Sequence, residues 1–340
     1  MNRSAVFALA VMALAAPALA SGYQITKTVP LGPPDHWDYL VFDPVMDRVY
    51  VSHAGTVTVV NGQSGEIVGT VEGIAGSTHG IVPLQALGKG YTDDSNAGVA
   101  VVFDLKSLKI LKQIKAEPDA DGMAYDAGTG HVLVIDGDSG KVTVIDPKTE
   151  TVVATIDGGG GLEYGVSGGN GKFYVNGAER NEIVRMDLTT NKADAHWPMP
   201  ACMRPHGLAI DRAHMRLFAT CSNKVMTVMN AENGHVIANL PIGEGTDFAE
   251  FDSVRGLAFS SNRDGTLSII QEKSPSEFVA LPPVKTQYGA RTMAVDPRTG
   301  RLYLVTADIA VNESAAPTDY RHRYTTKPGS VRLLFLDPTP

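Results

Sequence analysis

Seven side chains with ligand-binding or proton-transfer chemistry recur along the chain at intervals of 41 to 44 residues. Four are carboxylates, two are imidazoles and one is a guanidinium group. Carboxylates and imidazoles ligate divalent cations or act as general acids and bases, and a guanidinium group binds anions. In chain order these residues are Asp38, His79, Asp121, Glu163, His206, Asp247 and Arg291.

Two series of turns recur at this interval or at twice this interval, and they indicate the elements that position the seven residues. One series begins with Asp, at Asp43, Asp126, Asp211 and Asp296, and an apolar strand follows each turn. The second series falls at Asn61, Asp104, Asp146, Asp187, Asn230, Gln271 and Asp337. A period near 42 residues built from short strands predicts an all-β fold, a seven-bladed β-propeller.

In such a fold the first strand of each blade lies nearest the central channel, so the seven residues should form a ring around it. We call this set the polar ring. Polar side chains at strand ends could merely solvate the channel. Small hydroxyl and amide residues would serve that purpose equally well, and the ring contains none. Counting back across the turns places His53 opposite Asp38 and Asp136 opposite Asp121.

The termini suggest how the propeller closes and to which compartment the protein is exported. Residues 1–20 combine Arg3, an apolar run and an Ala-Leu-Ala end, a pattern typical of a cleaved secretory signal peptide. Residues 21–340 should then form one propeller in the periplasm. The segment Tyr23–Val29 resembles the fourth strands of other units, and the last unit lacks one. We therefore expect the N-terminal strand to join the last blade. An uncleaved anchor is the alternative, although the apolar run is short for a membrane span.

Composition limits the partners and the redox chemistry. The formal net charge of −8 disfavours nucleic acid, and no membrane span is expected once the signal is cleaved. We expect a monomer. Cys202 and Cys221 both lie in the fifth unit, where an exported protein could join them in a disulfide. Two free thiols or a soft metal site are the alternatives.

Three stretches of the sequence, residues 146–156, 216–226 and 289–303, resemble the YVTN-repeat β-propellers, in particular the exported bacterial YncE-like group. The likeness spans essentially the whole chain after residue 20. It implies the propeller fold, with WD40-like repeats. It does not specify an activity, because related propellers act as binding scaffolds, lactonases, lyases and metal-cofactor housings. His79 and His206 depart from the smaller polar residues expected at these positions.

The last interval of the second turn series is about 24 residues too long, which places an insertion at 307–329. The loop between the second and third strands should emerge on the face where the first strands begin. The insertion could therefore cover the polar ring as a lid, or it could be a solvated loop or a partner surface. Its candidate ligand-binding residues are Tyr320, Arg321, His322 and Arg323.

Within the polar ring, neighbours should cooperate more readily than residues on opposite sides of the channel. Asp121, Glu163 and His206 are the candidates for a divalent metal site and for proton transfer. Arg291 should neutralise Asp247 and Asp38, or hold an anionic ligand.

Three functions fit this arrangement. The first is a periplasmic protein that binds a small ligand or a divalent ion at the channel mouth. The second is a metal-assisted hydrolase or lyase acting on a lactone or sugar-like substrate. The third is a scaffold for another exported protein. The sequence contains no nucleophile elbow, HExxH, CxxCH or paired CxxC motif, which favours binding without turnover.

Overall fold

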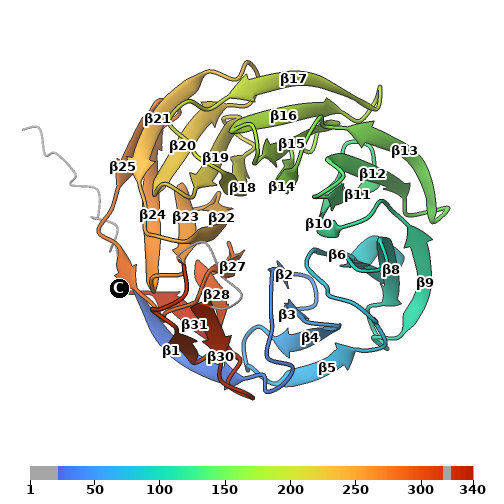
Figure 1. The fold of residues 1–340 in the computed structure, drawn as a ribbon, viewed down its shortest axis with the longest axis vertical. Helices are drawn as coiled ribbons and strands as arrows, with labels where there is room; N and C mark the ends of the chain where they lie inside the picture. The colour runs from blue at the N-terminus through green and yellow to red at the C-terminus, as the bar shows by residue number, and fades with distance from the viewer. Residues whose placement is uncertain (1–21, 317–322, 340) are drawn as a thin grey trace, which may run out of the picture.

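The computed structural model describes residues 22–316 and 323–339. Seven antiparallel sheets surround a central channel, and the predicted seven-bladed β-propeller is confirmed (Figure 1). No helix in the described ranges is long and apolar enough to cross a membrane. The predicted signal peptide lies outside the described residues.

Each of the first six blades uses four consecutive strands, and the first of them is innermost (Figure 1). The first three blades are β2 (Leu40–Asp43), β3 (Arg48–His53), β4 (Thr56–Asn61) and β5 (Ile67–Val71); β6 (Ile81–Leu84), β7 (Lys89–Asp94), β8 (Val99–Asp104) and β9 (Ile110–Lys115); and β10 (Ala120–Asp126), β11 (His131–Asp136), β12 (Lys141–Asp146) and β13 (Thr151–Asp157). The next three are β14 (Leu162–Ser167), β15 (Lys172–Gly177), β16 (Glu182–Asp187) and β17 (Lys192–Pro198); β18 (Pro205–Asp211), β19 (Arg216–Cys221), β20 (Val225–Asn230) and β21 (Val236–Pro241); and β22 (Thr246–Asp252), β23 (Leu257–Asn262), β24 (Thr266–Ser274) and β25 (Glu277–Ala280), with β26 (Val284–Lys285) also paired to β24.

The seventh blade combines both ends of the chain. It contains β27 (Thr292–Asp296), β28 (Arg301–Thr306), β31 (Arg332–Pro338) and, as its outer strand, β1 (Tyr23–Pro30). Antiparallel pairing runs from Tyr23 opposite Pro338 to Pro30 opposite Arg332. The N-terminal strand thus covers an edge of β31 that would otherwise be open to pairing with other chains.

The hydrophobic core lies between blades. Seven clusters of buried apolar side chains each join two adjacent blades, including one between the seventh and the first. Middle strands such as β11 are buried on both faces, which explains their continuous apolar runs, whereas outer strands such as β13 are mostly exposed. No blade can bury its own faces alone, so the ring folds as one unit.

The insertion is a hairpin between β28 and β31. Its described part contains β29 (Ile309–Val311) and β30 (Tyr324–Thr326), which pair with each other and with no other strand. Arg323 immediately precedes β30. Tyr320, Arg321 and His322 lie outside the described residues.

Candidate functional site

β-bulges aim the ring residues into the channel. In four blades the pairing of the first two strands shifts register at the ring position, between Ala120 and Gly122, for example, and between Thr246 and Phe248. The extra residue is left out of the ladder, which frees Asp121 and Asp247 to point away from their own sheet. In the first blade, Asp38 N–H donates to Ser52 and Ser52 N–H donates to Tyr39.

These bulges overturn two cross-strand expectations. Asp136 pairs with Ala120, not with Asp121. Asp38 and Tyr39 both face Ser52, and the Nδ1 atom of His53 lies 3.0 Å from Thr58 Oγ1. Counting across the turns assumed regular ladders, and one inserted residue moves every later partner by one position.

The polar ring forms two connected groups of side chains. In one, His79 bridges its neighbours, with Nε2 at 4.0 Å from Asp38 and Nδ1 at 3.6 Å from Asp121. In the other, Nδ1 of His206 lies 3.5 Å from Glu163 and 3.9 Å from Asp247. Arg291 extends this second group through a hydrogen bond of 2.7 Å to Asp247. Residues from all seven blades therefore converge around the channel.

Asp93 on β7 belongs to this network, although its sequence position gave no sign of it. Its side chain is fully buried. The carboxylate accepts hydrogen bonds from His79 N–H at 3.0 Å and Gly80 N–H at 2.7 Å, and it lies 2.9 Å from His79 Nδ1. Burial raises the pKa of Asp93, while the charge of His79 and the hydrogen bonds from His79 and Gly80 oppose this rise. Asp93 thereby fixes both the backbone and the imidazole of His79.

Acidic neighbours raise the pKa of both histidines of the polar ring. Burial opposes the imidazolium of His79, but the hydrogen bond to Asp93 and the charges of Asp93, Asp38 and Asp121 outweigh it and raise its pKa to about 10. At His206, Glu163 likewise outweighs burial and raises the pKa.

The carboxylic acids respond in the opposite sense to burial. Burial raises the pKa of Asp38 to about 6, with Asp247 and Asp93 adding to the effect while Arg291 and His79 oppose it. Burial also raises the pKa of Asp121 well above its usual value. Asp38 therefore changes charge near neutral pH, which suits either ligand binding or proton transfer.

Arg291 neutralises one of its two expected partners. It forms an ion pair with Asp247. Its effect on Asp38 is a longer-range charge interaction that lowers the Asp38 pKa. The guanidinium group also donates to the Trp37 carbonyl at 3.2 Å and stacks over the Trp37 ring, with its Cζ atom 5.8 Å from the ring centroid. Trp37 itself is buried in the core between the seventh and first blades.

A layer of aromatic rings crosses the channel next to the polar ring. Tyr39, Tyr164 and Phe248 each follow a ring residue, and their ring centroids are 4.6 to 5.2 Å apart. Gly80 and Gly207 also follow ring residues. A Cβ atom there would lie 2.2 and 2.4 Å, respectively, from the backbone of the next blade. Aromatic side chains thus fill the channel at three of these positions, and glycine at two others lets adjacent first strands pack closely.

Two cavities lie on opposite sides of this aromatic layer. One, of about 750 Å³, lies beyond Tyr164 and Phe248 and contains no member of the polar ring. The other, of about 780 Å³, includes His206 and Asp247, and we call it the upper pocket. Its further lining residues are Arg204, Ser222, Glu244, Gly245, Thr246, Arg263, Asp264, Tyr288, Arg323 and Tyr324.

The insertion contributes to the upper pocket. Tyr324 lies 6.3 Å from Tyr288, measured between ring centroids, and Arg263 stacks over the Tyr324 ring at 5.1 Å. Arg323 donates to the Ala315 carbonyl at 2.9 Å, which ties the two sides of the hairpin. Of the four insertion residues predicted to bind ligand, Arg323 lines the pocket, and the other three lie outside the described residues.

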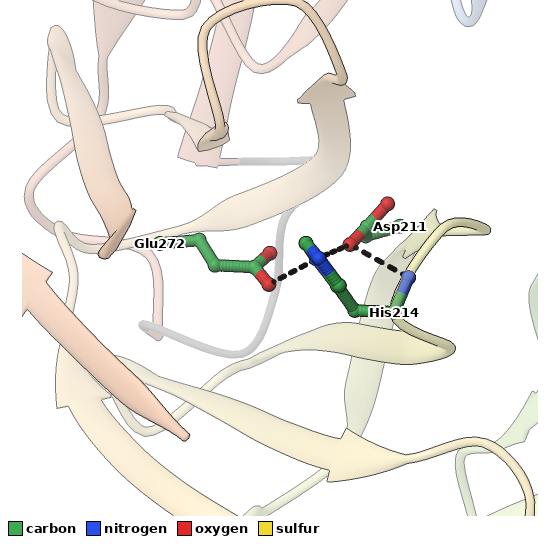
Figure 2. Close-up of side chains that lie close together, drawn as sticks. All are labelled: Asp211, His214 and Glu272. Carbon is green, nitrogen blue, oxygen red and sulfur yellow. Dashed lines mark hydrogen bonds and ion pairs between the residues drawn. The ribbon is translucent and has the colours of Figure 1, made fainter. Parts of the chain in front are cut away.

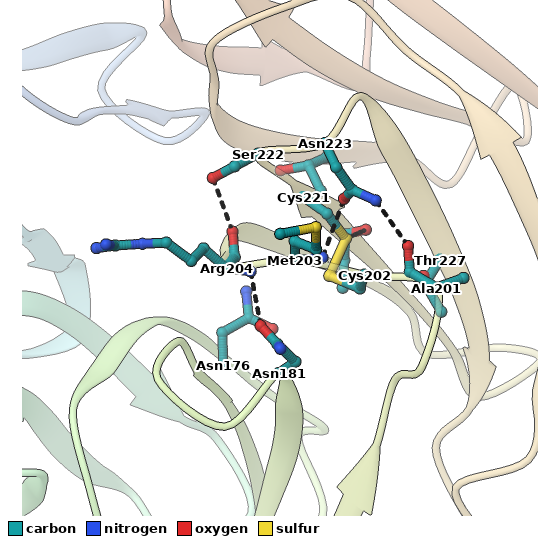
Figure 3. The surroundings of a disulfide bond; sticks show 12 residues. Asn176, Asn181, Ala201, Cys202, Met203, Arg204, Cys221, Ser222, Asn223 and Thr227 are labelled. Carbon is teal, nitrogen blue, oxygen red and sulfur yellow. Dashed lines mark hydrogen bonds between the residues drawn. A yellow bond between two sulfur atoms is a disulfide. The ribbon is translucent and has the colours of Figure 1, made fainter. Parts of the chain in front are cut away.

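The predicted disulfide is confirmed. Cys202 and Cys221 are joined, and Figure 3 shows the bond, which ties the loop that leads into β18 to the end of β19. Asn223 accepts from Met203 N–H and donates to the Ala201 carbonyl, while Asn181 accepts from Arg204 N–H (Figure 3).

These contacts hold Arg204 in a left-handed backbone conformation, with φ at 45°. Such a conformation is costly for a residue with a Cβ atom and persists only where the surroundings enforce it. The disulfide and the asparagine contacts thus fix the edge of the upper pocket.

The three proposed metal ligands of the ring are only partly brought together. Glu163 and His206 are 3.5 Å apart, whereas Asp121 contacts His79 instead. Within residues 22–316 and 323–339, no three ring members bring their ligand atoms within 4.8 Å of one another. Metal binding and catalysis by these residues remain predictions.

Comparison with known proteins supports the fold alone. No protein-family model and no curated protein sequence matches the chain. A chain of the "Crystal Structure of Mitotic Checkpoint Complex" matches with a TM-score of 0.73 and 14% identity, over 97% of this chain and 98% of that one. A chain of "Kuenenia stuttgartiensis Hydrazine Synthase" matches with a TM-score of 0.69 and 13% identity, over 83% of this chain and 96% of that one. This chain is similar to both as a propeller.

Proposed function

We propose that the protein binds a small molecule carrying an acidic group at the channel mouth, without turnover. The observation that carries this proposal is the continuity between the polar ring and the upper pocket, which share His206 and Asp247. The aromatic layer closes the channel beneath them, so a ligand would meet a floor of ionisable groups and a wall of polar and aromatic side chains. Such a concave site with few convergent charges is typical of small-molecule binding.

The charges of the upper pocket favour an anion. Arg204, Arg263 and Arg323 line it together with His206, whose pKa is raised by Glu163 against the effect of burial. Its acidic residues already have partners. Asp247 is paired with Arg291 and Glu244 with Lys224, and Asp264 accepts hydrogen bonds from Glu244 N–H and Thr266. Guanidinium groups bind carboxylates and phosphates through paired hydrogen bonds, and Tyr288 adds an aromatic side chain to the wall of the pocket.

Calorimetry with small carboxylates, phosphate esters and their uncharged analogues tests this proposal. We expect an acidic compound to bind the wild type, and binding to weaken at least about tenfold in Arg204→Ala and Arg323→Ala, because each removes a charge-assisted hydrogen bond. Arg185→Ala is the control, since Arg185 pairs with Asp194 on the outer strands of the fourth blade. No binding at all, or equal binding in all three variants, would reject the proposal.

We further propose that the protein is an exported, YncE-like member of the YVTN-repeat propellers and that it acts in the periplasm. The repeat sequence and residues 1–20 support this assignment. Mass spectrometry of the protein from fractionated cells should find a periplasmic chain that begins at Ser21. A chain that keeps residues 1–20, or one retained in the cytoplasm, would contradict export.

A protein partner is the second candidate function, and the hairpin insertion favours it. Its strands β29 and β30 pair only with each other. A propeller of the same fold occurs in a mitotic checkpoint complex. Co-purification of an exported protein should then survive His79→Ala and fail when residues 307–329 are deleted. Loss of the partner in both variants would argue against the hairpin as the docking element.

A further inference from the structure

A second cluster of potential ligand groups lies at the other end of the fifth blade. Asp211 ends the innermost strand β18, His214 stands in the turn that follows, and Glu272 extends from β24 of the sixth blade (Figure 2). His214 Nδ1 is 2.7 Å from Asp211 Oδ2 and 2.9 Å from Glu272 Oε1. One ligand atom from each residue lies within 4.8 Å of the others. The polar ring lies at the opposite ends of the first strands, so this cluster is separate from it.

Glu272 has a buried carboxylate whose ion-pair partner among the described residues is the imidazole of His214, which Asp211 shares. Its side chain is 4% exposed, and neither carboxylate oxygen receives a hydrogen bond within the described ranges. His214 Nδ1 is close to both carboxylates, yet a single ring nitrogen carries one proton at most and cannot serve both well. An ionised carboxylate in this position normally coordinates a metal ion or is fully hydrogen-bonded.

The repeats show that this carboxylate departs from the pattern of the fold. Glu272 lies in β24, one residue after Gln271, the member of the second turn series in its unit. The equivalent residues in the other units have no hydrogen-bonding side chain, and they are Gly62, Leu105, Pro147, Leu188, Ala231 and Pro338. A glutamate is not needed to build the blade, because six blades form without one.

His214 is a second departure at the same place. It stands three residues after the end of the innermost strand, where the other units have no imidazole, thiol or carboxylate: Met46, Leu87, Thr129, Asn170, Arg255 and Thr299. The two departures occur in adjacent blades, and their side chains meet. The fold brings them together because each second turn packs against the first turn of the preceding blade, as the hydrogen bond from Arg48 to the Leu105 carbonyl shows.

We propose that Asp211, His214 and Glu272 bind a divalent transition-metal ion of the zinc class, which links the fifth blade to the sixth. One imidazole nitrogen and two carboxylate oxygens are a ligand set that zinc accepts. His214 is 48% exposed, so the fourth position faces solvent and can hold water. Tetrahedral zinc ligands stand about 3.3 Å apart, and an ion would need the three groups to part by roughly half an ångström.

The surrounding charges set a limit on the affinity. Arg216 lies next to the cluster and its positive charge opposes a cation. Its guanidinium group is engaged by the carbonyls of Pro275, His214 and Met215. Asp211 also holds the turn through Ala213 N–H and His214 N–H. Because the turn keeps its shape through these backbone contacts, the ligands are preorganised.

Calorimetry and metal analysis of the purified protein, stripped with a chelator and titrated with Zn²⁺, test the proposal. We expect one Zn²⁺ per chain and a higher melting temperature with Zn²⁺. Glu272→Gln should weaken binding at least about tenfold and abolish the shift in melting temperature. This variant keeps the side-chain volume and removes the buried charge, so its metal-free melting temperature should equal or exceed that of wild type. His214→Ala should also lose the ion.

A similar pair elsewhere provides the control. His196 Nδ1 lies 3.0 Å from Glu182 Oε1 on the fourth blade, in a pair that belongs to no cluster of three ligands within the described residues. Glu182→Gln should therefore keep the zinc response. Failure of wild type to bind Zn²⁺, or equal binding in Glu272→Gln, would overturn the proposal. So would an ion that is lost in Glu163→Gln but kept in Glu272→Gln, since that ion would lie in the polar ring.

Discussion

Replacing Asp93 with Asn tests whether this carboxylate holds a charged imidazole at the centre of the polar ring. Asp93 is fully buried and His79 is 13% exposed. One pKa unit corresponds to about 1.4 kcal/mol, so the rise of the His79 pKa from 6.5 to about 10 sets a ceiling of roughly 5 kcal/mol on the coupling. Asp93→Asn leaves the imidazole without its main partner and should cost about 3 to 5 kcal/mol of unfolding free energy at pH 6.5.

The pH dependence separates this effect from simple loss of packing. A histidine whose pKa is higher in the folded protein stabilises it fully below the unfolded value of 6.5, and that stabilisation is lost as pH rises toward about 10. The melting temperatures of wild type and Asp93→Asn should therefore differ most near pH 6.5 and converge toward pH 10. Asp38, with a pKa of about 6, also titrates in the wild type, but mostly below this window.

Melting temperatures measured at pH 6.5, 8 and 9.5, together with the His79 pKa from an NMR titration, test this prediction. Asp94→Asn is the matched control. Asp94 is equally buried and adjacent, and it accepts from Gly76 N–H and Ala97 N–H without contacting a histidine. Asp94→Asn should lose stability without changing the titration of His79. A wild-type His79 that titrates near 6.5, or an unchanged titration in Asp93→Asn, would refute the reasoning.

Three further predictions concern the frame around the site. Cys202→Ser with Cys221→Ser opens a loop with a sequence separation of 19 and should lower the unfolding free energy by about 3 kcal/mol, measured by denaturant titration; no loss would show that the asparagine contacts suffice. Gly80→Ala places a Cβ 2.2 Å from Met123 N and should cost about 1 to 3 kcal/mol in the same assay, and a neutral result would mean that adjacent first strands can separate freely. Deleting residues 23–31 uncovers β31 and should sharply lower the melting temperature, whereas an unchanged melting curve would contradict closure by β1.

The period of the sequence was sufficient to predict the blades and the convergence of the polar ring. Every unit places a chemically distinctive residue at one strand position, and strand position determines distance from the axis. The disulfide followed for a similar reason, since both cysteines lie near the same end of one hairpin. Such inferences need only chain order and strand direction.

What sequence could not supply was the register within each blade. The β-bulge that frees Asp121 also shifts the partner of Asp136 by one position, to Ala120. No residue type in the sequence indicates such a bulge. Asp93 was missed because a carboxylate on a second strand looks like any polar strand end until its three donors are seen. The cluster around Glu272 had a signal, an acid where other units have Gly, Leu, Pro or Ala, but only the aligned units reveal it.

The aromatic layer of Tyr39, Tyr164 and Phe248 joins side chains of three blades across the axis, and the interior has two separate compartments. The residues that line one cavity are absent from the lining of the other. Each compartment can therefore be filled, emptied or altered by mutation while the other keeps its contents.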